Sequence, residues 1–248
     1  MNDRGESPQH PEEPGLDTIS NEALIAGIIE RYDALVNYFP DDFVGSTFAN
    51  YDFLESPSER DEFVSTYREL PIEKTEALRE RLSRYPLIDL GSNTGLPLDI
   101  KRKFGISDYT GVDLVHYRNR FRKSENRKFV RADLLEYMLK QPDNAANIMA
   151  NGVLHQDFFG YENRPYDRQS DNSKRDLEYV RRLFREIQRV LPDDGIFLGT
   201  GFHFPKIAAE VGLQLRDDLS DSEPITSDSQ QQEEVVLYVY EKQRNVKY

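Results

Sequence analysis

From Pro86 onward, short apolar runs alternate with longer segments of helical periodicity. Such alternation is typical of β-α-β units, in which successive strands pair in parallel and helices cover the sheet. The predicted strands are Leu87–Leu90, Tyr109–Leu114, Lys128–Arg131, Ala146–Ala150, Gly195–Gly199, Gln214–Asp217 and Val235–Glu241. The last of them is an almost continuous apolar run, which predicts burial on both of its faces. This part of the chain is therefore expected to fold as an α/β domain with a mostly parallel sheet.

Five helices are predicted between these strands from the spacing of their apolar residues. They span about Leu96–Phe104, His116–Lys123, Leu134–Gln141, Ser173–Leu191 and Pro205–Val211. The polar stretch from Asp218 to Gln232 is interpreted as a mobile loop before the last strand. The α/β domain is accordingly assigned to residues 86–248.

The N-terminal part of the chain has a different pattern. Residues 1–16 are rich in Pro, Gly, Glu and Ser and almost free of apolar side chains, which predicts a disordered tail. A helix is predicted over about Thr18–Tyr38, with Ser20 as its N-cap. A second helical stretch covers about Ser58–Tyr85, with an interruption at Pro71. Residues 17–85 are therefore interpreted as an N-terminal helical extension.

Composition excludes several classes of protein. The 248 residues carry a formal net charge of −13, which disfavours non-specific contact with nucleic-acid phosphates or anionic membranes. The absence of cysteine excludes disulfides, thiolate metal sites and thiol nucleophiles, and no metal is expected. No apolar run approaches membrane-spanning length, and the polar N-terminus is not a secretory signal. A cytoplasmic protein without membrane contact is therefore expected.

The strongest functional motif is PLIDLGSNTGLPLDI, residues 86–100. A strand ends in an acid, Asp89, a loop with Gly91 and Gly95 follows, and then a helix begins. Glycine lets the backbone turn sharply and approach a ligand closely, and the start of a helix offers free N–H groups. The motif predicts a nucleotide-binding loop. A plain strand-to-helix turn is the alternative.

Two further strands also end in an acid. Asp113, in YTGVDLV, stands at the tip of the second strand, where a carboxylate can accept hydrogen bonds from both ribose hydroxyls. Asp133, in KFVRADLLEYM, ends the third strand, where it can accept a hydrogen bond from an adenine amino group. Aspartate is also favoured as a helix N-cap, which remains the alternative for both residues.

Two of the four histidines are predicted at the same edge of the sheet, where the strands have their carboxyl ends. His155 follows Asn151-Gly152 after the fourth strand, and His203 follows the fifth strand in GTGFHFP. Histidine acts as a general base near neutral pH, so both are candidate catalytic residues. The alternatives are a helix-start residue packed beside the ligand for His155 and an ordinary loop residue for His203.

Taken in order, the segments from about residue 86 to residue 243 resemble the class I S-adenosylmethionine-dependent methyltransferases. The resemblance implies a Rossmann-like fold, with a seven-stranded, mostly parallel sheet, an antiparallel last strand and helices on both faces. It implies S-adenosylmethionine as the cofactor, with its methionine end at the glycine loop, its ribose at Asp113 and its adenine near Asp133. The implied cofactor-binding residues are Asp89, Gly91, Ser92, Asn93, Gly95, Asp113, Leu114, Asp133, Leu134, Asn151 and Gly152.

The glycine loop departs from this family at one position, because Asn93 stands where the family usually carries a middle glycine. Asparagine tolerates unusual backbone angles better than most residues. A dehydrogenase is disfavoured, since the dinucleotide fingerprint is G-x-G-x-x-G and this loop has only Gly91 and Gly95. Asp89 in front of the loop would repel a pyrophosphate, whereas an acid suits the positive ammonium group of a methionine.

Two other regions bear on the methyl acceptor. Aromatic residues between Tyr38 and Phe53 form a candidate lid over the acceptor pocket, or part of a helical layer on the sheet. Seven basic residues between Arg118 and Arg131 indicate an anionic acceptor or an RNA contact, or a solvated helix face.

The leading hypothesis is in-line methyl transfer to an oxygen or nitrogen atom of a small molecule. An RNA methyltransferase is the alternative among enzymes. A non-catalytic cofactor-binding protein that serves as a regulator or partner is the alternative from another class. The sequence indicates neither the acceptor nor an oligomeric state.

Overall fold

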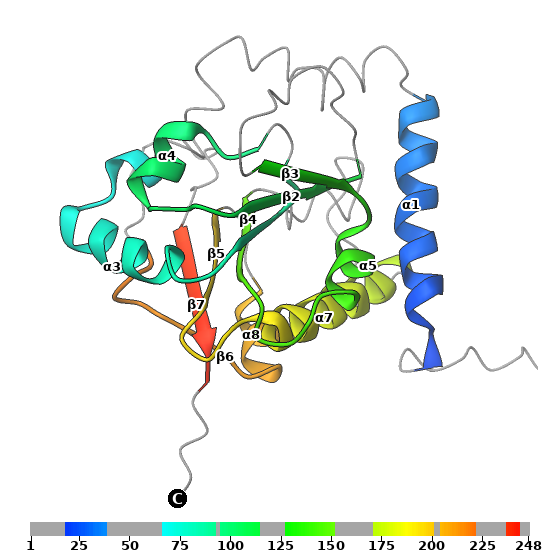
Figure 1. Cartoon of the computed structure of the whole chain (residues 1–248). Coiled ribbons are helices and arrows are strands. Elements are labelled where there is room, and N and C mark those ends of the chain that lie inside the picture. The colour runs from blue at the N-terminus through cyan, green and yellow to red at the C-terminus, as the bar shows by residue number, and fades with distance from the viewer. Residues whose placement is uncertain are drawn as a thin grey trace, which may run out of the picture.

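A computed structural model describes residues 18–38, 66–92, 95–114, 127–151, 171–200, 204–221 and 237–243. At its centre is a seven-stranded sheet in the order β3-β2-β1-β4-β5-β7-β6 (Figure 1). The strands are β1 (Leu87–Leu90), β2 (Tyr109–Asp113), β3 (Arg127–Arg131), β4 (Asn147–Asn151), β5 (Ile196–Thr200), β6 (Leu213–Leu215) and β7 (Leu237–Lys242). Strands β1 to β5 are parallel, and β7 runs antiparallel to both β5 and β6. This is the Rossmann-like α/β fold that the sequence predicted.

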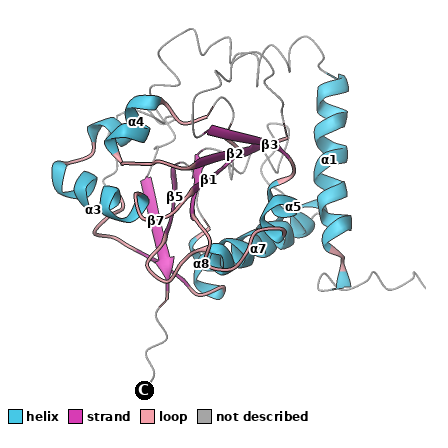
Figure 2. Cartoon of the chain, viewed as in Figure 1, coloured by secondary structure: helices cyan, strands magenta, loops and turns pink. Residues whose placement is uncertain are grey.

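Helices cover both faces of the sheet, as Figure 2 shows. On one face lie α3 and α4, and on the other lie α5, α7 and α8, with α1 packed on the outside of α7. Their bounds are α1 (Asn21–Tyr38), α3 (Ile72–Leu82), α4 (Leu98–Lys103), α5 (Leu134–Leu139), α7 (Asp171–Val190) and α8 (Pro205–Glu210). A further helical turn, Thr66–Glu69, precedes α3.

Neighbouring residues of β1, β4, β5 and β7 enter two separate cores. In β1, Leu87 packs in the core beneath α3 and α4, whereas Ile88 and Leu90 pack in the core beneath α5 and α7. In β7, Val239 enters the first core and Tyr240 the second. Because both faces of the sheet are covered, most residues of its central strands are apolar. That burial explains why they appear in the sequence as short continuous apolar runs.

The N-terminal helices contribute to both cores. Leu24 and Ile28 of α1 belong to the core beneath α7, whereas Leu78 and Leu82 of α3 belong to the other. The predicted N-cap of α1 is confirmed, because the Ser20 hydroxyl accepts a hydrogen bond of 3.2 Å from the backbone N–H of Ala23. The division of the chain after residue 85 and the lid role of the extension stay predictions.

The predicted elements of the α/β part that the structure describes begin and end within two residues of the observed ones. The prediction for β6, Gln214–Asp217, is wrong at its end, because the chain turns at Arg216, whose carbonyl accepts from the N–H of Leu219. The helix predicted from Leu96 begins instead at Leu98, because Pro97 has the extended backbone of a residue outside the helix. The predicted helix at 116–123 and the predicted tail at 1–16 lie outside the described residues.

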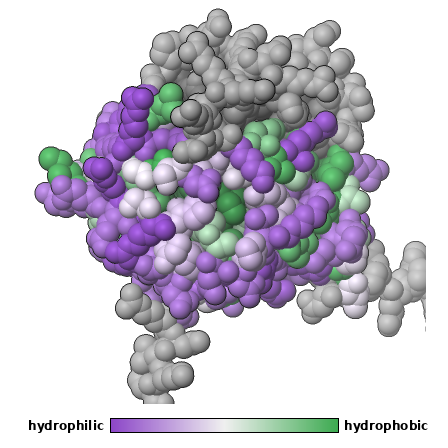
Figure 3. All heavy atoms as spheres, viewed as in Figure 1, coloured by the Kyte–Doolittle hydropathy of each residue, from purple (hydrophilic) through white to green (hydrophobic). Residues whose placement is uncertain are grey.

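None of the described helices is both long and apolar enough to cross a membrane. The described surface in the view of Figure 3 is mainly hydrophilic, in keeping with the 31% of charged residues in the sequence. The most exposed large apolar side chain among the described residues is that of Ile72, at the start of α3.

Candidate functional site

The glycine loop follows β1 as a tight turn held against β2. The N–H groups of Gly91 and Ser92 both donate to the carbonyl of Val112, at 2.8 and 3.1 Å, and the N–H of Gly95 donates to the carbonyl of Ser92 at 2.6 Å. Gly91 and Gly95 have φ angles of 67° and 85°, in the left-handed region that favours glycine. Both glycines are therefore required by the backbone of the loop. Asn93, between them, lies outside the described residues.

Asp89, the acid before the loop, is bonded inside the protein. Its side chain is only 4% exposed and accepts a hydrogen bond of 2.5 Å from the Tyr109 hydroxyl, which itself accepts one of 3.0 Å from the N–H of Leu96. Burial raises the pKa of Asp89 to about 7, and the charge of Asp113 adds to the rise, while the Tyr109 hydrogen bond opposes it. Asp89 and Tyr109 thus connect β1 and β2 to the end of the glycine loop.

Ser92 lies directly on β2 because residue 111 has no side chain. A Cβ atom at Gly111 would stand 2.5 Å from Ser92 Oγ and 2.9 Å from Ser92 Cβ, closer than such atoms come in proteins. Ser92 Oγ is buried, and it has no hydrogen-bond partner within the described part of the chain. The sequence analysis did not single out Gly111, although a glycine inside a strand is a recognised sign of close backbone approach.

Asp113 ends β2 beside this loop. Its residue is 9% exposed, and its backbone carbonyl accepts a 3.1 Å hydrogen bond from the N–H of Ala132, which follows β3. Leu114 comes next, and its carbonyl accepts a 3.0 Å hydrogen bond from Arg131 Nε. Asp113 and the glycine loop are thus side by side at the carboxyl ends of β1 and β2, as the sequence predicted.

Asp133 occupies the N-cap position of α5, the alternative considered from the sequence. Its Oδ1 accepts a 3.1 Å hydrogen bond from the N–H of Glu136, and its Oδ2 accepts one of 2.9 Å from the Tyr179 hydroxyl. Burial raises the pKa of this carboxyl, which is 1% exposed. Leu134, the first residue of α5, is buried in the core. An adenine-binding role for Asp133 and Leu134 stays a prediction.

Asn151 ends β4 and is bonded to a tyrosine that sequence analysis missed. Its Oδ1 accepts a 2.6 Å hydrogen bond from the hydroxyl of Tyr67 and a 3.3 Å one from Thr200 Oγ1, at the end of β5. The Tyr67 ring is fully buried and packs edge-on against Phe104, with ring centroids 6.1 Å apart. Burial raises the pKa of Tyr67 well above its usual range, so its hydroxyl stays protonated and can donate.

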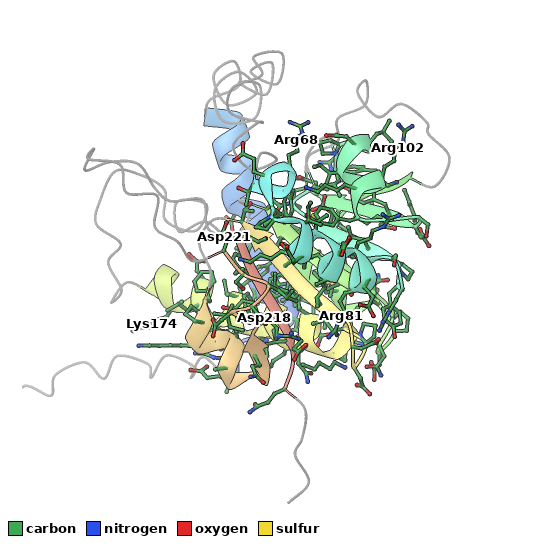
Figure 4. The ribbon with its side chains drawn as sticks, turned by 90° about the vertical axis from the view of Figure 1, so that its left-hand side faces the viewer. Arg68, Arg81, Arg102, Lys174, Asp218 and Asp221 are labelled. Atoms are coloured by element: carbon green, nitrogen blue, oxygen red, sulfur yellow. The ribbon has the colours of Figure 1, made fainter. Side chains whose placement is uncertain are left out.

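The helical turn that carries Tyr67 is fastened to α4. Lys103 Nζ donates to the carbonyls of Tyr67 and Arg68, at 2.8 Å each, and Arg68 Nε forms a 2.8 Å ion pair with Asp99. In Figure 4, Arg68 lies in the upper part of the molecule, as Arg102 of α4 does, while Arg81, at the end of α3, lies below. A segment of the N-terminal extension is therefore held next to the carboxyl edge of the sheet.

The carboxyl edge brings together most of the predicted binding residues. Those that the structure describes there are Asp89, Gly91, Ser92, Gly95, Asp113, Leu114, Asp133, Leu134 and Asn151. Gly152 and the two candidate bases, His155 and His203, lie outside the described residues, as does most of the basic stretch from 118 to 131. Sequence reasoning therefore found this edge, but it missed Tyr67, Tyr109, Gly111 and Thr200, which hold it together.

A groove of about 610 Å³ lies elsewhere, between α1, α5 and α7. Its lining residues are Ile19, Asn21, Leu135, Leu139, Glu178, Arg182, Arg185 and Glu186. Two of its charged residues are paired with each other, since Arg182 Nε bonds Glu178 at 2.9 Å, and Arg182 also donates to Asn21. These bonds join α1 to α7. We assign the candidate site to the carboxyl edge instead, because the loop and the acids that suit a nucleotide lie there.

Comparison with protein-family models gives no match, and comparison with curated protein sequences gives none either. Many solved structures that resemble the chain are S-adenosylmethionine-dependent methyltransferases. One is 1,6-didemethyltoxoflavin-N1-methyltransferase of Burkholderia thailandensis, with 1,6-didemethyltoxoflavin and S-adenosylhomocysteine bound. Its sequence is 18% identical, the match covers 80% of this chain and 88% of that chain, and the TM-score is 0.46. Another is a TehB-like methyltransferase of Corynebacterium glutamicum: 19% identity, 72% and 92% covered, TM-score 0.44.

The [4+2]-cyclase SpnF is also among the solved structures that resemble the chain, with 22% identity, 58% of this chain and 57% of that chain covered, and a TM-score of 0.37. Likeness at such identities concerns the fold alone, and a fold does not determine a reaction. The function must therefore be argued from the residues at the carboxyl edge.

Proposed function

We propose that the chain binds S-adenosylmethionine at the carboxyl ends of β1, β2 and β4 and transfers its methyl group to an oxygen or nitrogen atom of a small molecule. The observation that carries the proposal is the pairing of a glycine loop with two acids. Asp89 is the last but one residue of β1 and Asp113 is the last residue of β2, and they are close enough that the charge of Asp113 raises the pKa of Asp89. Negative groups at this place favour a ligand with positive charge, such as a sulfonium and an ammonium.

The residues present fit this cofactor. The positive φ angles at Gly91 and Gly95 favour glycine, and because glycine has no side chain, a ligand can approach the backbone at these two positions. In the proposed arrangement the loop takes the methionine end and Asp113 accepts hydrogen bonds from the ribose hydroxyls. A dinucleotide fits less well, because its pyrophosphate would face the carboxyl of Asp89. The loop also lies where β1 has β2 on one side and β4 on the other, the point at which strand order reverses and open α/β sheets bind ligands.

When bound, S-adenosylmethionine supplies a methyl group that is already activated by its sulfonium. The protein then has to hold the acceptor in line with that methyl group, exclude water and remove a proton from a hydroxyl or amine acceptor. His155 and His203 are the proposed bases, because each follows a strand that ends at this edge. The aromatic part of the N-terminal extension is the proposed lid.

A small-molecule acceptor is favoured over RNA by the charge of the chain. A net charge of −13 repels a polyanion. Arg131, the last of the seven basic residues, also donates to the backbone carbonyl of Leu114, which engages part of its guanidinium within the fold. A non-catalytic cofactor-binding role, the alternative, predicts binding of S-adenosylmethionine without methyl transfer, which a methyl-donor turnover assay distinguishes. The cytoplasmic location stays a prediction.

Calorimetric titration with S-adenosylmethionine and S-adenosylhomocysteine tests the proposal. We expect saturable binding of both, and a loss of more than about tenfold in affinity for Asp113→Ala, because two hydrogen bonds to the ribose are lost. Asp108→Ala is the matched control, since Asp108 is an exposed acid just before the other end of β2. Circular dichroism checks that both variants fold. Wild-type-like affinity in folded Asp113→Ala contradicts the ribose assignment.

A further inference from the structure

The hydroxyl of Tyr67 fixes the orientation of the Asn151 side chain. Tyr67 is fully buried, and the bond of its hydroxyl to Asn151 Oδ1 is short, at 2.6 Å. A buried hydroxyl requires an acceptor, and turning the Asn151 amide over would leave the Tyr67 proton facing an NH₂ group instead. The carbonyl oxygen of the amide therefore points at Tyr67.

Asn151 Oδ1 is also saturated. An amide carbonyl has two lone pairs, and here Tyr67 and Thr200 Oγ1 use both. Thr200 is 1% exposed and pairs directly with Asn151 across β4 and β5. The amide can therefore offer a ligand only its Nδ2 donors, and no described residue is bonded to them.

Asn151, which carries these donors, lies beside the first residue of the glycine loop. In the register of the sheet Ala150 pairs with Leu90, so Asn151 is the next residue along β4 and Gly91 the next along β1. Asn151 is partly exposed, whereas Tyr67 and Thr200 behind it are buried. An N–H donor beside the loop suits a ligand group that accepts hydrogen bonds.

We infer that the Asn151 amide, held by Tyr67 and Thr200, binds the carboxylate of the methionine end of the cofactor. This inference rests on the proposed function. The methionine end carries an ammonium, which suits the acids, and a carboxylate, which the same acids would repel. The two Nδ2 protons offset that repulsion. Tyr67 is thus a positioning residue supplied by the N-terminal extension, and the site discriminates against cofactor analogues that lack the carboxylate.

The test compares S-adenosylmethionine with decarboxylated S-adenosylmethionine, which differs from it by that one group, in calorimetric titrations of the full chain. In Asn151→Asp, one carboxylate oxygen still accepts from Tyr67 and the other faces the ligand. We expect the affinity for S-adenosylmethionine to fall by more than about tenfold, because two carboxylates then meet, and that for the decarboxylated compound to change by less than about threefold.

Tyr67→Phe gives a second, milder variant that keeps the ring in its core. The amide loses one of its two restraints, so the preference for S-adenosylmethionine over the decarboxylated compound should shrink about threefold or more. Tyr85→Phe is the matched control, because the Tyr85 hydroxyl also bonds a side-chain oxygen, that of Asp194 at 2.5 Å, but at the opposite edge of the sheet. Its preference should equal that of the wild type.

Three outcomes overturn the inference or part of it. Equal weakening of both compounds in Asn151→Asp shows that the amide does not recognise the carboxylate, and an unchanged preference in Tyr67→Phe shows that Tyr67 does not position the amide. In both cases the proposed function stands. Absence of saturable binding of either compound by the wild type removes the proposed function, and the inference with it.

Discussion

The pKa values of acids at the two edges of the sheet are shifted in opposite directions. At the amino edge, Asp194 accepts hydrogen bonds from Tyr85 and Arg84, and these hydrogen bonds hold the pKa of its carboxyl below the usual range. At the carboxyl edge, Asp89 and Asp133 are buried and accept hydrogen bonds from tyrosine hydroxyls, and burial raises the pKa of both. The charged form of Asp194 is therefore stabilised by its partners, whereas burial disfavours the charged forms of Asp89 and Asp133.

Two further arginines, Arg81 and Arg216, form bonds at the amino edge. Arg81 donates to the carbonyl of Asp194 and lies 3.9 Å from Glu241, and Arg216 bonds both Glu241 and Asp218. Arg81, Arg216 and Glu241 are partly buried, and these bonds connect the turn before β5 to the end of β7. The contrast supports the proposal that the carboxyl edge binds the cofactor, while the bonds at the amino edge hold the fold together.

The largest expected effect is the pH dependence of stability that Asp89 confers. Its folded pKa, about 7, lies above the unfolded value near 4, so its contribution to stability is complete below about pH 4 and is lost as pH rises through about 7. Asp89→Asn lacks this titration, and its stability should rise relative to the wild type by roughly a few kcal/mol between pH 4 and pH 8. Urea unfolding at both pH values measures the difference.

Asp194→Asn should show the opposite pH dependence of stability in the same experiment. The pKa of Asp194 is lowered, so its contribution is present above about pH 4 and is lost as pH falls further. This variant should therefore differ from the wild type at neutral pH and converge with it in acid. The same pH trend in both variants would erase the contrast between the two edges.

A smaller effect is expected from Gly111→Ala. The added methyl group meets Ser92, so the loop has to move off β2, at a cost of roughly 1–3 kcal/mol in stability and with weaker binding of S-adenosylhomocysteine. Gly27→Ala in α1 is the control, because nothing lies within 4 Å of its added Cβ. That change should stabilise the helix by up to about 1 kcal/mol. Thermal unfolding and calorimetry of both variants decide whether Gly111 matters for the loop.

The sequence was sufficient where the signal is local. The seven strands, the Ser20 cap and the two glycines of the loop each follow from residues within a few positions of one another. Asp133 shows the limit of local prediction, because the sequence around it fits an N-cap role and an adenine-binding role equally well. Its bond to Tyr179, 46 residues away, belongs to neither role.

The supporting residues of the site could not be found locally. Tyr67 and Asn151 are 84 positions apart, and Tyr109 and Asp89 are 20 apart on different strands. Nothing near Tyr67 in the sequence distinguishes it from the other aromatic residues of the extension. Its role depends on how α4 holds the Thr66–Glu69 turn, which is a property of the packed fold.

A crystal structure of the chain grown with S-adenosylhomocysteine would show where the cofactor binds. We expect the ribose hydroxyls within hydrogen-bonding distance of the Asp113 carboxylate and the homocysteine end against the loop from Gly91 to Gly95. A ligand bound in the groove between α1, α5 and α7, or one that leaves Asp113 without a bond, would contradict this expectation.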